Sequence, residues 1–139
     1  MPQDISGYDV GALLYCPANA HHTVAQAVTA ERLPRPFSLA LCLEDTVRAD
    51  ALAAAEQAVE QTLHDLTDAA RQETFYRPLT FVRVRSPEQL ARLGRAYGKY
   101  RPLLTGFILP KFFIETCGAY CAVIRDLQAD GLDYFYMPV

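Results

Sequence analysis

The chain is predicted to be an α/β protein with a parallel β-sheet, because five short apolar runs alternate with segments of helical periodicity. Short continuous apolar runs are typical of strands that are buried on both faces, as they are in parallel sheets. Hydrophobic residues make up 51% of the 139 residues and charged residues 21%, which excludes a disordered chain. One globular domain is therefore expected.

The first strand is expected over residues 11–16, an apolar run that Pro17 ends. Asn19 follows, and its side chain is of a type that caps helices, so a helix is expected from there to about Arg32. A second apolar run predicts the next strand over residues 37–43. The chain thus begins with a strand, a helix and a strand.

The strongest helical pattern covers residues 49–66, where apolar side chains recur every three or four positions among Ala, Glu and Gln. A third strand is expected over residues 79–84. Ser86 then stands as an N-cap before Pro87, and Gln89 completes a capping box. These residues predict that the next helix begins at this point.

The alternation continues to the end of the chain. A fourth strand is expected over residues 104–109, a helix over 114–127 that Gly131 stops, and a fifth strand over 132–137. Strict alternation implies parallel strands joined by right-handed crossovers. Two architectures fit this order, namely an open doubly wound sheet and the first part of a (β/α)₈ barrel.

Charged side chains gather where the predicted strands end. Glu44 and Asp45 follow the second strand, Arg83 and Arg85 end the third, and Lys111 follows the fourth. Because the carboxyl ends of parallel strands meet at one edge, these side chains are expected to lie together. They either pair only to satisfy one another or form a functional site, since unpaired charges at such places are costly to bury.

The composition excludes several classes of function. The net charge is −3 and the basic residues are scattered, so no nucleic-acid-binding surface is expected. No apolar run approaches the roughly 18 residues that a membrane span needs, and no signal peptide is visible, so a cytoplasmic location is expected. The cysteines form no C-x-x-C pair and are expected to be buried free thiols: Cys16, Cys42, Cys117 and Cys121.

Four short motifs occur in order along the chain: LYCPAN at 14–19, LCLEDTV at 41–47, FVRVR at 81–85 and GFILPK at 106–111. With these motifs the sequence resembles the HpcH/HpaI aldolase and citrate lyase β-subunit family of TIM barrels. It looks closest to the C–C bond lyase branch found beside tellurium-resistance genes. The resemblance implies a partial TIM barrel with about five strands of eight. Residues 1–139 would then be the N-terminal portion of a lyase domain.

The resemblance also implies an activity and a site. The expected enzyme cleaves or forms a C–C bond in a 2-hydroxy or 2-oxo acid, or in its CoA thioester, with Mg²⁺ or another divalent cation. Catalytic roles are implied for Arg83, Glu44 and Asp45, with the two acids near the metal and its waters. Substrate contacts are implied for Arg83, Arg85, Lys111 and Asn19.

The chain departs from the sequence pattern of the family at three positions. Gly11 stands where an arginine often opens the first strand, and Arg85 stands where an asparagine follows the third. Phe113 occupies the position of a metal-binding glutamate, and Glu115 lies two residues further on. The main metal ligands are therefore expected beyond Val139.

Five strands would leave an eight-stranded barrel open. Both sheet edges and the inward-facing side chains should then be exposed, with on the order of 1,000 Å² of apolar surface. Two other functions stay open. The chain could be a non-catalytic half-barrel that binds a second copy or a C-terminal half-barrel, or a flavodoxin-like open sheet that binds an anionic ligand. A strand order of 2-1-3-4-5 would support the flavodoxin-like sheet, and a sequential order would reject it.

Overall fold

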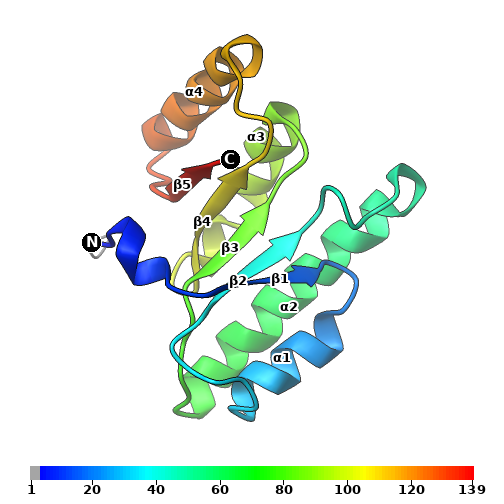
Figure 1. Ribbon diagram of the computed structural model, residues 1–139, viewed down its shortest axis with the longest axis vertical. Coiled ribbons are helices and arrows are strands. Elements are labelled where there is room, and N and C mark those ends of the chain that lie inside the picture. Colours follow the sequence, from blue (N-terminus) through cyan, green and yellow to red (C-terminus); the bar gives the residue numbers. More distant parts are fainter. Residues whose placement is uncertain (1–3) are drawn as a thin grey trace.

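Five strands and four α-helices alternate along the chain in the computed structural model, which describes residues 4–139 (Figure 1). Residues 1–3, which belong to the N-terminus where no signal peptide is expected, lie outside this range. The elements are β1 (Leu13–Pro17), α1 (His21–Thr29), β2 (Ser38–Cys42), α2 (Leu52–Gln72), β3 (Thr80–Arg83), α3 (Pro87–Ala96), β4 (Leu104–Leu109), α4 (Ile114–Ala129) and β5 (Phe135–Pro138). Short 3₁₀ turns are η1 (Gly7–Val10), η2 (Ala49–Ala51) and η3 (Gly98–Tyr100).

The strands form one parallel sheet in the order β1-β2-β3-β4-β5. This sequential order confirms the α/β class and rejects the flavodoxin-like sheet, in which β1 would separate β2 from β3. The sheet is not closed, because β1 and β5 each pair with one neighbour only. The fold therefore fits a partial barrel.

All four helices pack on one face of the sheet. Their apolar side chains join a single core cluster with alternate residues of the central strands. Right-handed crossovers between sequential neighbours put every helix on the same side, as in a barrel. The strand residues on this face are Leu39, Leu41, Val82, Phe107 and Leu109.

The opposite face carries a smaller apolar cluster of Ala40, Phe81 and Ile108, each at most 2% exposed. The expectation of exposed inward-facing side chains is therefore wrong for the three central strands. Each of these strands is flanked on both sides, and the N-terminal segment packs against the cluster through Val10. The Ser38 hydroxyl donates a 2.6 Å hydrogen bond to the Val10 carbonyl and holds the segment there. Edge strand β1 has no neighbour on one side and stays more exposed.

The helix boundaries differ from the expected ones most clearly at the start of α1 and at the end of α2. Asn19 does not cap α1, because the Ala18 N–H is bonded to the Cys42 carbonyl and the helix begins only after Ala20. Helix α2 continues to Gln72, past the expected end at residue 66. Its additional turn is stabilised by alanines that pack against the core.

The N-terminus of α3 follows the expected capping in part. The Ser86 hydroxyl accepts a 3.2 Å hydrogen bond from the Gln89 N–H, and Pro87 opens the helix. The Gln89 side chain, however, accepts from the Arg85 N–H at 2.7 Å instead of closing the box on Ser86. The helix start is thereby tied to the end of β3.

The last strand is held by close packing at β4 and α3. A Cβ at Gly106 would lie 1.8 Å from the Phe135 carbonyl oxygen, so the close approach of β5 requires glycine there. The Tyr134 hydroxyl donates a 2.6 Å hydrogen bond to the Gly94 carbonyl of α3. The Tyr136 hydroxyl is buried and has no partner in the described part of the chain.

Two further expectations concern the cysteines and the membrane. All four cysteines are free, but only Cys42 is buried. Cys16 and Cys117 are half-buried and Cys121 is exposed on α4, so the expectation of buried thiols is wrong for these three. Within residues 4–139, the helices are each too short or too polar to cross a bilayer.

The tyrosines of β5 predict a loss of stability in alkali. Burial raises the pKa of Tyr134 and of Tyr136 from the ordinary 10 to about 12. The unfolded chain therefore loses these protons first, and stability present below pH 10 falls as the pH rises toward 12. Tyr136→Phe should reduce this fall without lowering the melting temperature at neutral pH, as its hydroxyl has no partner.

Thermal melts followed by circular dichroism at neutral and alkaline pH check this prediction. Tyr134→Phe is the matched control, since it deletes the hydrogen bond to Gly94 and should lower the melting temperature already at neutral pH. An alkaline loss in Tyr136→Phe as large as that of the wild type would contradict the prediction.

Candidate active site

The ends of β2 and β3 bring a carboxylate and a guanidinium together. Cys42 pairs with Arg83 in the sheet, and Glu44 lies two residues after Cys42 on the same face. Arg83 Nη2 lies 2.7 Å from Glu44 Oε2 and 3.4 Å from Asp45 Oδ2. The predicted meeting of these side chains at one edge of the sheet is thus present.

Lys111 joins the cluster from the turn after β4. Its Nζ lies 3.3 Å from Glu44 Oε1, so each oxygen of this carboxylate faces one cation. Lys111 has a φ of +53°, a left-handed conformation that costs a non-glycine residue about 1 kcal/mol. The Thr116 hydroxyl donates a 2.6 Å hydrogen bond to the Lys111 carbonyl and stabilises this turn.

Burial differs strongly among the four ion-paired residues of the cluster, of which Lys111 is 69% exposed. The side chain of Glu44 is 6% exposed and that of Arg83 is 20% exposed, whereas that of Asp45 is 70% exposed. Burial alone would lower the pKa of Arg83, but the negative charge of Glu44 raises that pKa. Arg83 therefore stays protonated, with Asp45 on the solvent side.

Two tyrosines complete the surroundings, and neither was predicted as a site residue. The ring centroid of Tyr15 lies 5.6 Å from Arg83 Cζ, which is within the range of a cation–π contact. Tyr15 could have been found from the sequence, because its position on β1 puts it on the same inward face of the sheet as Arg83. Tyr120 of α4 is buried, and its hydroxyl donates to the Pro110 carbonyl at 3.5 Å, beneath the Lys111 turn. Nothing in the sequence spacing indicates that contact.

Arg85 and Asn19 lie outside the cluster of ion pairs. Arg85 Nε donates to the Leu43 carbonyl at 3.2 Å, and its Nη2 donates to the carbonyls of Glu44 and Val47. Asn19 is exposed in the turn after β1. The substrate contacts expected of both residues stay predictions.

The described residues do not fit a metal site. Among the side chains that the structure describes, no three of His, Cys, Asp or Glu are placed to hold a metal ion. Glu44 and Asp45 are two carboxylates, and Arg83 and Lys111 already balance their charges. Mg²⁺ is usually bound through one or two carboxylates and keeps waters as its other ligands, but both carboxylates here are already paired with cations.

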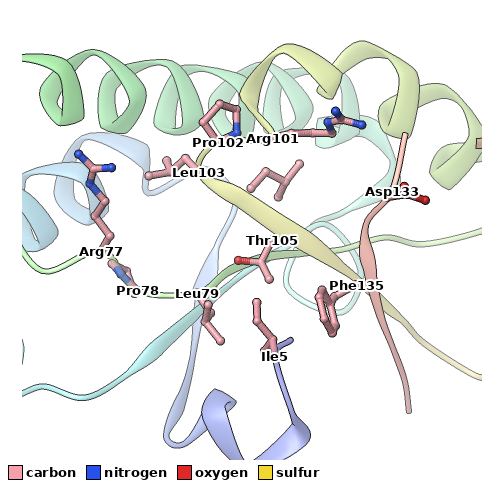
Figure 2. A pocket seen from close by; sticks show the side chains of 11 residues that line it. Ile5, Arg77, Pro78, Leu79, Arg101, Pro102, Leu103, Thr105, Asp133 and Phe135 are labelled. Carbon is pink, nitrogen blue, oxygen red and sulfur yellow. The ribbon is translucent and has the colours of Figure 1, made fainter. Parts of the chain in front are cut away.

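A cavity of about 550 Å³ lies at the opposite end of the sheet, where β3, β4 and β5 begin (Figure 2). Figure 2 shows Ile5 of the N-terminal segment beside Leu79, Thr105 and Phe135. None of the four cluster residues lines it. In parallel α/β folds the chemistry gathers at the carboxyl ends of strands, so we place the candidate site at Arg83 and not in this cavity.

Comparisons with known proteins give a family match and distant similarities to solved structures. The model of a family described as C–C bond lyases of the TIM-barrel fold matches residues 4–139. A comparison with curated proteins finds no match. Among solved structures, the chain is similar to the citrate lyase β subunit from M. tuberculosis, which was solved in complex with oxaloacetate and magnesium. The identity is 17% over 91% of this chain and 77% of that chain, with a TM-score of 0.31.

Removing the buried carboxylate should destabilise the protein. Glu44→Ala removes the partner of Lys111 and leaves Arg83 with only the exposed carboxylate of Asp45, which should lower the free energy of unfolding by about 3 kcal/mol. Asp45→Ala removes only an exposed partner and should cost less than about 1 kcal/mol. Urea denaturation at neutral pH measures both values, and equal losses in the two variants would contradict the assigned role of Glu44.

Proposed function

Because the chain belongs to the C–C bond lyases of the TIM-barrel fold, we propose that Arg83 and Lys111 bind the oxygens of a 2-hydroxy or 2-oxo acid whose C–C bond is cleaved or formed. One observation supports this proposal above the others. Glu44 is buried and holds cations from two different strand ends at one edge of the sheet. Its burial gives the two cations fixed places on which an anionic substrate can dock.

The proposed reaction of a 2-hydroxy acid uses the charges of this cluster. A base removes the hydroxyl proton, the carbon–oxygen double bond forms, and the C–C bond breaks. Its electron pair then passes to the leaving carbon, where a carbonyl group attached to that carbon takes it up as an enolate. Arg83 and Lys111 stabilise the negative oxygens that develop. The planar guanidinium of Arg83 also suits a bidentate contact with the substrate carboxylate.

The two acids of the cluster have different proposed roles. Glu44 stays in place and orients Arg83, because its carboxylate is buried between the two cations. Asp45 is exposed, and its 3.4 Å contact with Arg83 is longer than the 2.7 Å contact of Glu44, so an incoming carboxylate displaces Asp45 from the guanidinium. Once displaced, Asp45 is the carboxylate of the cluster that can accept the hydroxyl proton. Asn19 then contacts the substrate from the turn after β1.

A divalent cation, a CoA thioester and a cytoplasmic location stay predictions from the resemblance. The carboxylates of the cluster face Arg83 and Lys111, so the main ligands of such a cation are expected outside this cluster.

Loss of the Arg83 guanidinium should weaken substrate binding. Oxaloacetate is a suitable probe because it is a 2-oxo dicarboxylate. Arg83→Ala should weaken its binding by about tenfold or more, and Arg83→Lys should fall between, because an ammonium cannot form the bidentate contact. Isothermal titration calorimetry measures the affinities. Arg48→Ala is the matched control, since Arg48 is exposed and pairs only with Asp50. The same affinity in Arg83→Ala and in Arg48→Ala would exclude the proposed contact.

A second function is favoured by the open sheet. β1 and β5 leave their outer backbone groups unpaired, and such edges invite pairing with another chain. We propose that a second copy or a C-terminal half-barrel pairs with them, and that the chain serves as an oligomerising or binding module. Light scattering on the purified chain should give a mass above 15.5 kDa that rises with concentration. A monodisperse monomer with one cooperative melt would contradict assembly of the chain with itself.

A further inference from the structure

We propose that Arg85 is a positioning residue, which fixes the loop of residues 43–47 and thereby aims Glu44 at Arg83 and Lys111. This inference rests on the proposed role of Arg83 and Lys111 in binding an anion. It gives Arg85 an action through Glu44, in place of the substrate contact that the family resemblance implies.

The guanidinium of Arg85 spans both ends of the loop. Its Nε donates to the Leu43 carbonyl at 3.2 Å, at the start of the loop. Its Nη2 donates to the Glu44 carbonyl at 3.1 Å and to the Val47 carbonyl at the far end. Backbone carbonyls that follow a strand have no ladder partner, and here one planar side chain satisfies three of them.

The backbone of Arg85 is itself held by a hydrogen bond to helix α3. Its backbone N–H donates to Gln89 Oε1 at 2.7 Å, and the Gln89 side chain is buried. Gln89 Nε2 in turn donates to Glu56 Oε1 of α2 at 2.8 Å, and both oxygens of Glu56 accept from Arg92 at 2.7 Å. The loop that carries Glu44 is thus connected through Arg85 to two helices.

This connection bears on the site because the backbone of Glu44 is one of the groups that Arg85 holds. The Glu44 carboxylate must reach Arg83 from β3 and Lys111 from the turn after β4 at the same time. Rotation of the Glu44 backbone would break one of these contacts or both. Lysine at position 85 would keep the charge, but its ammonium cannot span three carbonyls as the planar fork does.

Hydrogen exchange tests the hold on the loop. In Arg85→Ala, the amides of residues 43–47 should exchange about tenfold faster, while those of β4 and α4 keep their wild-type rates. Arg48→Ala is the matched control, because Arg48 lies just after the loop, is exposed, and bonds to Asp50. Unchanged exchange of the loop in Arg85→Ala would overturn the proposal. Arg85→Lys serves as a second variant if the alanine variant does not fold.

A second readout separates positioning from general stability. The Nε–H of Arg83 is buried and should give a sharp ¹⁵N-edited NMR signal in the wild type. In both Arg85 variants this signal should broaden at temperatures where the protein is folded, and the affinity for oxaloacetate should fall about tenfold. A lower melting temperature with an unchanged Arg83 signal would show a purely structural role and overturn the proposal. Wild-type protein that binds no oxaloacetate would refute the proposed function, while the exchange rates and the Arg83 signal would still decide the role of Arg85.

Discussion

The carboxylate of Glu44 is buried between two cations that come from different parts of the chain, and the carboxyl edge of the sheet is arranged around it. A buried charge is tolerated only where partners compensate it. Neighbouring strands lie about 4.8 Å apart, so Glu44 reaches Arg83 only because β2 and β3 are adjacent. In a sheet with β1 inserted between them, the distance would double and the carboxylate would lose its partner. The buried ion pair therefore requires that β2 and β3 are neighbours, as the sequential strand order makes them.

Much of this edge could be predicted from residues alone. Apolar runs that end in Glu44, Arg83 and Lys111 indicate charges at strand ends, and the parallel arrangement brings such ends together. The strand order could not be read in the same way, because periodicity is equal in an open sheet and in a barrel. The family resemblance supplied that choice, and the structure agrees with it.

The contacts of Arg85 and Gln89 show why other parts of the site were not predictable. A strand-end arginine is equally suited to a substrate carboxylate and to backbone carbonyls, and only the path of the loop at residues 43–47 decides between them. Gln89 has the spacing of a capping box, yet its side-chain oxygen accepts a hydrogen bond from the Arg85 N–H. Its side-chain NH₂ group is oriented by its hydrogen bond to Glu56 of α2. Which hydrogen-bond partner such a side chain takes depends on residues far along the chain, and a local sequence pattern holds no information about them.

The charges of the cluster determine how it can select an anion. Its two carboxylates balance Arg83 and Lys111, so no excess positive charge is available to attract a ligand. The partners differ instead in how easily they leave: Glu44 is buried, whereas the exposed pair of Asp45 contributes less than about 1 kcal/mol. Binding of a substrate carboxylate then amounts to exchange of one weak partner of Arg83 for a bidentate one. The gain depends on the geometry of the guanidinium, and hence on the loop that holds Glu44 beside it.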